Sequence, residues 1–433
     1  MNKNLIQRRR TGREARAIGL TLVGAGLLSL HATDGYFSHG YGIKAKGRAG
    51  VSLAQTDDAF GGANNPATIA WVENRVDFGV DWFSPERKAE RTGPAVPFNG
   101  SVQSERDHFF IPELAYKHAV SDTVAVALTI YGNGGMNTDY PAGQLNLGPG
   151  AAGMNLLAGP GHLGVNLTQL LVAPTVSWKF AEDQSIGLAP IVAYQRFKAY
   201  GLGAFAPLSQ DATALTDVGV ETSWGVGVRV GYYWNITPEV AVGAAYSSPV
   251  FSERLEAYRG LFAGDGSFDI PQSFGVGFGW QITPTLRAGV DYRYIDYADI
   301  DPVGTPSATP GLLGQAGGPG FGWESISVIK VGGDWKLAEH WTVRAGYGYN
   351  ENPVPDTEVT FNIVAPGVVQ HHVTAGLTFD FGRSEISLGY MHAFEHSVDG
   401  DSRFVALGFA PPGTREEISM SQNSLGLASS YKF

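Results

Sequence analysis

Cationic side chains that alternate with small or apolar residues are the positions of this chain best suited to chemistry. Five of them fall on the same side of such alternating stretches: Arg229, Arg287, Arg293, Lys330 and Arg344. Asp291 and Asp334 share that side. An arginine or lysine that faces an enclosed space either pairs with an acid or holds an anionic ligand group. The pattern predicts binding chemistry, and Arg229, Arg293 and Arg344 are candidate contacts for a ligand.

Hydrolytic catalysis is the competing prediction. Ser397 follows a group of four histidines: His371, His372, His392 and His396. No G-x-S-x-G sequence accompanies them, and the chain has no cysteine to act as a nucleophile or thiolate ligand. The DGD sequence at 399–401 lacks the further oxygen ligands of a calcium loop. We therefore expect no enzyme, no cofactor and no metal site, with a hydrolase as the alternative.

The first 32 residues have the three parts of a secretory signal. Residues 1–16 carry six basic side chains and one acidic side chain, residues 17–30 carry no charge, and Ala32 is a plausible cleavage point. The alternative is a membrane anchor, but about 14 apolar residues fall short of the roughly 20 that a spanning helix needs. We therefore predict a signal peptide over 1–32 and an exported mature chain.

Charge and composition exclude nucleic acid as a partner. The whole chain holds 30 basic and 41 acidic residues, and 24 and 40 remain without residues 1–32, a net charge of about −16. An acidic exported chain without a basic stripe is a poor binder of nucleic acid. The absence of cysteine, together with 58 glycines and only 16% charged residues, favours a fold closed by backbone hydrogen bonds.

Alternation with a period of two residues is the main structural signal of the mature chain. In SWGVGVRVGYYW, residues 223–234, Trp and Val side chains occupy one face with aromatics at both ends, while glycines and Arg229 occupy the other. A soluble sandwich would pack this apolar face on a second sheet, whereas aromatic ends around a valine band match the girdles of a transmembrane strand. Comparable strands recur in pairs joined by short turns near residues 121, 236, 284, 339 and 383.

Long connections join the strands at the other end. They are rich in Gly, Pro, Asp or Ser and cover 84–106, 132–167, 199–220, 251–270, 298–322, 351–368 and 397–417. Short turns at one end and long loops at the other are typical of an outer-membrane barrel, whose closed sheet leaves no unpaired edge in lipid. Counting from Val76 gives about 14 strands. The predicted fold is an all-β transmembrane antiparallel β-barrel over 75–433.

The end of the chain indicates which membrane the barrel enters. The last residues alternate toward the terminus: Leu425, Leu427, Tyr431 and Phe433. A terminal aromatic on an amphipathic last strand resembles the signal recognised by the outer-membrane insertion machinery of Gram-negative bacteria. We expect that machinery, outer-membrane lipid and lipopolysaccharide as partners. Arg196 and Lys198 have outward parity near the outer end of their strand, where they would meet lipopolysaccharide phosphates unless a bulge turned them inward.

Residues 33–74 look unable to build a core alone, because they are rich in Gly and Ala and poor in large apolar groups. A barrel of about 14 strands is wider than its own side chains fill, so its lumen is either open or plugged. We expect this segment to be an N-terminal hatch, or plug, in the lumen; a disordered periplasmic tail is the alternative. A bare inward strip offers it a close approach: Gly275, Gly277 and Gly279.

Several motifs of the mature chain resemble the FadL/TodX family of outer-membrane transport proteins. They are GYFSHGYG (35–42), KGRAG (46–50), NPA (65–67), YGNGGMNTDY (131–140), AYQRFK (193–198) and the block from RAGY (344–347) to FNIVAPG (361–367). The resemblance implies a monomeric barrel of fourteen strands with a hatch, which imports hydrophobic molecules such as long-chain fatty acids or aromatic hydrocarbons. The ligand would pass from a groove between extracellular loops to a lumen pocket and leave sideways into the membrane.

The resemblance also implies roles for particular residues. The hatch anchor would be formed by four residues: Asn64, Asn65, Pro66 and Ala67. The ligand pocket would be contacted by Tyr36 and Phe37, near the mature N-terminus. The family has a kink in its third strand that opens the lateral way out. Three glycines just beyond the third predicted strand would permit local bending: Gly132, Gly134 and Gly135.

Apolar residues in the long loops would supply the groove. A long acyl chain gains about 0.8 kcal/mol per buried methylene, so its route needs apolar surface of graded depth. Four loop residues fall on one predicted helical face: Leu255, Tyr258, Leu261 and Phe262. Further apolar loop residues are Met154, Leu156, Leu157, Leu202, Phe205 and Leu208. Packing of the loops on one another is the alternative role.

These patterns and the resemblance predict a transporter that takes up hydrophobic molecules, foremost long-chain fatty acids, with release gated by the hatch. The alternatives are an aromatic hydrocarbon channel of the same family, a polar diffusion porin with charged ladders and no hatch, and an adhesin or purely structural barrel. The two hydrophobic substrates differ in whether a lumen cation is free to bind a carboxylate.

Overall fold

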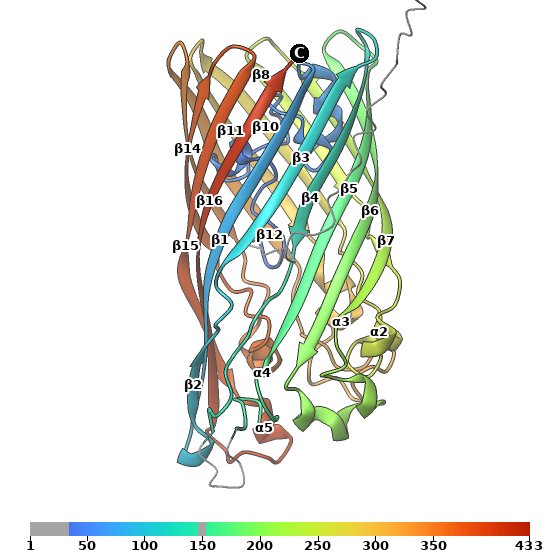
Figure 1. The fold of residues 1–433 in the computed structure, drawn as a ribbon, viewed down its shortest axis with the longest axis vertical. Coiled ribbons are helices and arrows are strands. Elements are labelled where there is room, and N and C mark those ends of the chain that lie inside the picture. The colour runs from blue at the N-terminus through green and yellow to red at the C-terminus, as the bar shows by residue number, and fades with distance from the viewer. Residues whose placement is uncertain (1–33, 146–152) are drawn as a thin grey trace, which may run out of the picture.

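A computed structural model describes residues 34–145 and 153–433 of the chain. The signal peptide predicted for residues 1–32 lies outside these described residues. One antiparallel sheet contains all sixteen strands of the described part, and two of them are short additions beside the wall. The remaining fourteen form a single closed barrel, whose long axis is vertical in Figure 1.

The wall consists of long strands joined in chain order. They are β1 (Arg75–Thr92), β3 (Phe109–Ala119), β4 (Val124–Gly134), β5 (Gly164–Lys179), β6 (Gln184–Tyr200), β7 (Glu221–Asn235), β8 (Val240–Ser247), β10 (Ser273–Thr283), β11 (Leu286–Ile295), β12 (Ile326–Ala338), β13 (Trp341–Asn350), β14 (His371–Asp380), β15 (Ser384–Asp401) and β16 (Arg415–Lys432). The short strands are β2 (Gly100–Gln103), which pairs with β1, and β9 (Phe251–Ser252), which pairs with β7.

Short helices lie in the segment before β1 and in the loops. The α-helices are α1 (Ile43–Lys46), α2 (Ala263–Gly266), α3 (Asp301–Gly304), α4 (Val359–Asn362) and α5 (Arg403–Ala406). The 3-10 helices are η1 (Phe60–Gly62), η2 (Pro66–Trp71), η3 (Val96–Phe98), η5 (Gly203–Leu208), η6 (Ala212–Ala214), η7 (Glu256–Tyr258), η8 (Tyr297–Asp299) and η9 (Asp356–Glu358). Among the described residues no helix has the length and apolar character needed to cross a membrane.

The first and last wall strands close the barrel. β1 pairs with β16 along its whole length, from Arg75 opposite Lys432 to Thr92 opposite Arg415. Closure satisfies the backbone groups that would otherwise be exposed to lipid at a sheet edge. The terminal Phe433 stacks on Tyr116 of β3 with ring centroids 5.9 Å apart. The predicted closed barrel and its number of strands are therefore confirmed.

The alternation predicted from the sequence separates the two faces of the wall. On β7 the side chains of Trp224, Val226 and Val230 are exposed on the outside, whereas Arg229 and Tyr233 are buried inside. This arrangement gives lipid an apolar surface and keeps charge in the lumen. The cations and acids assigned to the lumen side of the alternation lie there, and Arg196 and Lys198 stay on the outward side of β6.

Three strands extend further toward the loop end than the sequence analysis predicted. The expected loop 84–106 overlaps with β1, which continues to Thr92. The expected loop 397–417 overlaps with β15, which continues to Asp401, and with β16, which begins at Arg415. Outward residues at this end of β1 are charged, Glu86 and Lys88 among them, and they are exposed. These outward charges hid the alternation, because a strand that has left the lipid faces water rather than acyl chains.

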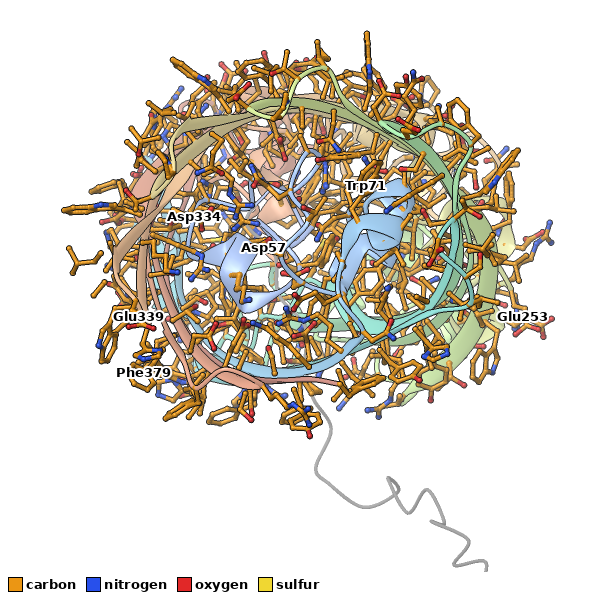
Figure 2. All side chains as sticks on the ribbon, turned by 90° about the horizontal axis from the view of Figure 1, so that it is seen from above. Asp57, Trp71, Glu253, Asp334, Glu339 and Phe379 are labelled. Atoms are coloured by element: carbon orange, nitrogen blue, oxygen red, sulfur yellow. The ribbon has the colours of Figure 1, made fainter. Side chains whose placement is uncertain are left out.

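Residues 34–74, which precede β1 and which we call the N-terminal segment, lie inside the barrel (Figure 2). Figure 2 looks along the barrel and shows this chain, with Asp57 and Trp71, within the ring of strands. Inward glycines of the wall let the backbone or side chains of this segment approach closely: Gly187, Gly231, Gly243, Gly277, Gly289, Gly332, Gly346, Gly376, Gly389 and Gly426. The strip predicted on β10 is confirmed, since Leu53 and Ala54 lie against Gly275, Gly277 and Gly279.

Buried ion pairs hold the N-terminal segment to distant strands. Lys44 pairs with Glu385 of β15 at 2.5 Å and Lys46 pairs with Asp81 of β1 at 2.8 Å. Arg48 pairs with Asp334 of β12 at 3.1 Å, and Asp57 within the segment also pairs with Arg48, at 2.7 Å. A buried charge is tolerated only with a partner, so these pairs specify where the segment sits.

Candidate ligand-binding site

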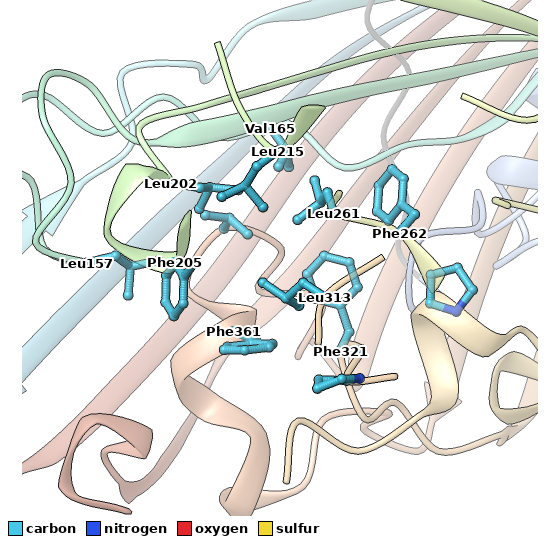
Figure 3. A pocket seen from close by; sticks show the side chains of 14 residues that line it. Leu157, Val165, Leu202, Phe205, Leu215, Leu261, Phe262, Leu313, Phe321 and Phe361 are labelled. Carbon is cyan, nitrogen blue, oxygen red and sulfur yellow. The ribbon is translucent and has the colours of Figure 1, made fainter. Parts of the chain in front are cut away.

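A largely apolar cavity lies among the loops on the side of the barrel opposite the short turns. It holds about 50 Å³ of free space, and Figure 3 shows its lining. Apolar side chains, prolines and one glycine form that lining: Leu157, Val165, Leu202, Phe205, Leu215, Leu261, Phe262, Pro302, Leu313, Pro319, Gly320, Phe321, Phe361 and Val364. We call it the loop cavity. Such a space suits a hydrophobic ligand.

Different loops supply the two sides of the loop cavity. Phe205 lies in η5, Leu202 is the residue directly before η5, and Phe361 lies in α4. The ring of Phe205 lies 5.4 Å from that of Phe361, nearly at right angles to it. Edge-to-face packing of this kind fixes loops that are far apart in the sequence.

The predicted helical face in the loop after β8 is wrong in its geometry. Leu255, Tyr258, Leu261 and Phe262 do not share a continuous α-helix, because only the 3-10 turn η7 forms. Gly264 and the two residues after it have positive φ, which ends any right-handed helix there. Leu261 and Phe262 nevertheless line the loop cavity, whereas Leu255 and Tyr258 are fully buried behind it.

An aromatic cluster joins the N-terminal segment to the loops. The ring of Tyr36 lies 5.0 Å from Tyr297 and 5.9 Å from Trp323, and Phe37 lies 5.7 Å from Tyr297. The Tyr297 hydroxyl donates to the carbonyl oxygen of Asp34 at 2.5 Å and accepts from the backbone N–H groups of Tyr36 and Phe37. Burial raises the pKa of both tyrosines, so these hydroxyls remain neutral hydrogen-bond donors.

A second cavity lies beside Tyr36, and we call it the inner cavity. It holds about 20 Å³ of free space and is lined by Gly35, Tyr36, Arg87, Gly135, Met136, Asn137, Thr138, Trp323, Ala365, Pro366, Gly367 and Met420. Thr138 separates it from the loop cavity: its hydroxyl donates to Val364 at 2.7 Å, and its N–H donates to Val165 at 2.9 Å. Both acceptor residues line the loop cavity, so only a thin wall divides the two spaces.

The wall of the barrel is interrupted between β3 and β4. These strands pair only from Ala119 opposite Ala125 to Leu114 opposite Ile130, although β3 continues to Phe109 at the loop end. Beyond Ile130 the register of β4 against β5 shifts between Gly132 and Gly134. Such a bulge bends a strand. Gly132 and Gly134 therefore lie within β4, rather than beyond it as predicted, and Gly135 follows directly.

The N-terminal segment takes the place of β3 as partner of the bent end of β4. Phe37 bridges Gly134, the N–H of Ser38 donates to Asn133 at 2.9 Å, and the N–H of Gly135 donates to Tyr36 at 3.1 Å. A side-chain carbon at Gly134 would lie 1.7 Å from the carbonyl oxygen of Tyr36. Only glycine permits this approach, so the position of the segment and the bend of β4 depend on each other.

Comparison with known proteins identifies the fold and the family. The model of the outer membrane protein transport protein family (OMPP1/FadL/TodX) matches residues 35–433. The chain belongs to this family. It is thus an outer-membrane transport protein for hydrophobic compounds, as the resemblance implied. No curated protein sequence matches the chain.

Solved structures with this fold include relatives of low sequence identity. The toluene transporter TodX of Pseudomonas putida has 18% identity, with 93% of this chain and 100% of that chain covered and a TM-score of 0.68. A FadL homologue of Pseudomonas aeruginosa has 16% identity, with 92% and 100% covered and a TM-score of 0.64. The toluene transporter TbuX of Ralstonia pickettii has 15% identity, with 91% and 99% covered and a TM-score of 0.60.

In this FadL/TodX barrel the three candidate lumen arginines lie in different places. Arg229 donates to the carbonyl oxygen of Gly62 at 2.7 Å and to the Tyr131 hydroxyl at 3.1 Å. Arg293 lines a small space beside Phe37 together with Arg229. Arg344 pairs with Asp334 at 2.5 Å and lines a charged vestibule at the short-turn end. Arg344 is therefore remote from the loop cavity, and we remove it from the candidate ligand contacts. The sequence pattern could not show this, because the pairing of Arg344 depends on where β12 and β13 meet the N-terminal segment.

The predicted anchor residues lie where the N-terminal segment meets strands β5 to β7. The Asn65 side-chain amide donates to Leu53 at 2.8 Å and to Tyr232 at 2.9 Å, and its carbonyl oxygen accepts from the N–H of Ala67. Asn64 donates to the carbonyl oxygen of Tyr41 at 3.0 Å. Pro66 begins η2, and the carbonyl oxygen of Ala67 accepts from two serines of the wall: Ser177 and Ser185.

Sequence reasoning missed two groups of this FadL/TodX site. Leu215, Leu313, Phe321, Phe361 and Val364 complete the loop cavity, but isolated apolar residues in loops carry no periodic signal. Arg87 was assigned to a loop, although it lies in β1 and faces the inner cavity. Continuing the inward parity of β1 through Asp81 to position 87 would have found it.

Proposed function

We propose that this transporter takes up long-chain fatty acids from outside the cell. The loop cavity is the observation that carries this proposal, because it is apolar, faces the extracellular loops and lies next to the inner cavity. A ligand that is barely soluble gains about 0.8 kcal/mol for each methylene moved out of water. Successive apolar spaces therefore draw it from the loops toward the N-terminal segment.

We infer that the ligand leaves sideways between β3 and β4. Support comes from the β3–β4 ladder, which ends at Leu114 opposite Ile130, and from the hydrogen bonds of residues 36–38 to the bent end of β4. Movement of Tyr36 and Phe37 would open this side of the wall, while Asn64 to Ala67 keep the rest of the segment in place. In this proposal the N-terminal segment acts as the hatch, and Gly132, Gly134 and Gly135 permit the bend.

An aromatic hydrocarbon is the second candidate substrate. The loop cavity favours it in one respect, since no charged side chain contributes to its lining. A small aromatic molecule would be held by the rings of Phe205, Phe262 and Phe321 without any polar contact. Binding measurements with both classes of ligand separate the two candidates.

The test is direct binding to the purified mature protein in a nonionic detergent. Oleate, toluene and a small sugar are titrated by calorimetry or by competition with a fluorescent fatty acid. Saturable binding of oleate that exceeds binding of toluene supports fatty acid uptake, and the reverse order supports the hydrocarbon. Binding of neither hydrophobe, with free passage of the sugar through vesicles, would establish a porin and refute the proposal.

A matched pair of variants tests whether the loop cavity is the binding site. Leu313 lines the cavity and is 5% exposed, whereas the adjacent Leu312 is 40% exposed and outside it. We expect Leu313→Asn to weaken oleate binding about tenfold or more, because it removes apolar contact worth about 1.5 to 3 kcal/mol. Leu312→Asn should change the dissociation constant by less than about twofold. Equal effects of the two changes would place the ligand elsewhere.

A further inference from the structure

Arg87 is a buried cation without a partner acid in the described structure. Its side chain lies on the inner face of β1, and the residue is 2% exposed. None of the ion pairs among the described residues includes it, and its Nε has no hydrogen-bond partner. Its guanidinium donates to the carbonyl oxygen of Arg106, and Asp107 acts on it only at longer range.

Several other buried cations of this barrel have acids within contact distance, whereas Arg229 and Lys117 donate instead to neutral oxygen atoms of the chain. Arg91, two inward positions further along β1, pairs with Glu416 at 2.5 Å. Lys46 pairs with Asp81, and Arg48 pairs with Asp334. A buried charge without a counter-charge is costly, so a site that leaves one unpaired is prepared for an anion that arrives later.

The surroundings of Arg87 indicate the chemistry of that anion. The arginine lines the inner cavity together with apolar side chains: Tyr36, Met136, Trp323 and Met420. The hydroxyl of Tyr140, which interacts electrostatically with Arg87, is buried and also lacks a hydrogen-bond partner. A guanidinium that lines an apolar space, with the hydroxyl of Tyr140 near the guanidinium, fits a carboxylate attached to an alkyl chain.

We propose that Arg87 binds the carboxylate of the transported molecule in the inner cavity, and that this contact makes the protein selective for long-chain carboxylic acids. The proposal rests on the proposed function, because it assumes that hydrophobic ligands pass from the loop cavity to the inner cavity. The head of the acid reaches Arg87 while its tail remains in the apolar space beyond Thr138. Hydrocarbons lack the carboxylate and gain nothing from this arginine.

The position of Arg87 also links recognition of the acid to the lateral opening. Its guanidinium carbon lies 5.7 Å from the ring centre of Phe109, the first residue of β3, on the loop side of the last β3–β4 pair, Leu114 opposite Ile130. Gly135 and Tyr36, which hold the bent end of β4, line the same cavity. A carboxylate on Arg87 would therefore sit beside the contacts that must separate before release.

The test compares oleate with oleyl alcohol, which has the same alkyl chain and no charge. In the wild-type protein we expect oleate to bind about tenfold or more tightly than the alcohol, since a charged hydrogen bond is lost with the alcohol. Arg87→Gln should bring this ratio close to one while the dissociation constant of oleyl alcohol changes by less than about twofold. Arg87→Lys should keep a preference for oleate.

Lys88→Gln is the matched control, because it removes the same charge from the next residue on the exposed face of β1. It should retain the wild-type ratio. A ratio that survives Arg87→Gln, or equal weakening of both ligands, would overturn the proposal. If Arg293→Gln instead abolished the preference for oleate, the carboxylate would be assigned to the small space that Arg293 and Phe37 line, and the proposal for Arg87 would also be overturned.

A measurement on the wild-type protein covers the case in which Arg87→Gln does not fold. Oleate labelled at its carboxyl carbon should titrate at lower pH when bound than in detergent alone, because a nearby guanidinium favours the ionised form. An unshifted or raised titration would overturn the proposal. If the wild-type protein binds none of oleate, oleyl alcohol and toluene, the proposed function fails. If it binds oleate and oleyl alcohol equally tightly, only the proposed role of Arg87 fails.

Discussion

At the scale of single residues, Gly346 shows how missing side chains make room for the N-terminal segment. A side-chain carbon there would lie 2.4 Å from the carbonyl carbon of Arg48 and 2.6 Å from the backbone nitrogen of Ala49. Gly348, two residues along β13 on the same inner face, would meet its neighbours at 3.8 Å, an ordinary contact. The backbone of the N-terminal segment thus lies against Gly346, whereas the nearest atoms to Gly348 belong to side chains of the wall.

This difference gives a prediction with its own control. Gly346→Ala should lower the free energy of unfolding by about 1 to 3 kcal/mol, because a packed backbone must shift to admit the new carbon. Gly348→Ala should be neutral or stabilise by about 0.5 kcal/mol, since glycine weakens a strand. Denaturant titration of the refolded barrel in lipid vesicles measures both. Equal stability of the two variants would show that the segment does not press on the wall at Gly346.

At the scale of elements, the start of the N-terminal segment acts as a substitute strand. Residues 36–38 form backbone hydrogen bonds with the end of β4 that β3 leaves unpaired. The aromatic rings of Tyr36 and Phe37 simultaneously pack on Tyr297 in the loop after β11. One short stretch of chain therefore contacts the lateral break, the inner cavity and the loops.

Deleting residues 33–37 tests this arrangement. We expect oleate binding to weaken about tenfold or more, because Tyr36 contributes a wall of the inner cavity and a buried aromatic side chain is worth about 1.5 to 3 kcal/mol. Replacing the same residues by a Gly and Ser sequence of equal length controls for loss of backbone, and should weaken binding similarly. Unchanged binding in either variant would contradict a role of this stretch in the site.

At the scale of the whole molecule, buried ion pairs tie the N-terminal segment to strands around the barrel. Lys44, Lys46 and Arg48 are close in sequence, yet their acids lie on β15, β1 and β12. The acids sit on strands separated by long stretches of chain, so the pairs form only when the wall has closed. These three pairs thereby fix the middle of the segment in the lumen.

Removing these three cations should loosen the lumen. In the Lys44→Gln, Lys46→Gln, Arg48→Gln variant we expect larger ion conductance in planar bilayers and lower stability, because breaking one buried pair costs about 3 to 5 kcal/mol. A control with the same change of charge at exposed positions, Lys88→Gln, Arg254→Gln and Arg383→Gln, should conduct like the wild type. Equal conductance of the two variants would mean that the pairs do not seal the lumen.

The alternation of residues along the sequence by itself determined that the fold is a β-barrel and that the barrel spans a membrane. The alternation around Arg229 reports that one face of a strand meets lipid and the other meets a polar lumen, and each residue carries this information independently of its partners. The same parity placed Arg293 and Asp334 inside, and it identified the glycine strip on β10. The motifs between Gly35 and Gly367 indicated the family, which the family model over residues 35–433 then showed.

Only the tertiary structure decided which inward charges are paired and where a ligand finds space. Arg48 and Asp334 are 286 residues apart, and Arg344 joins them only because β12 and β13 pass beside the same turn of the N-terminal segment. The loop cavity likewise collects side chains from loops that are distant in the sequence. Arg87 has no partner acid among residues 34–145 and 153–433 for the same physical reason: ion pairing depends on three-dimensional proximity, which no local pattern of residues encodes.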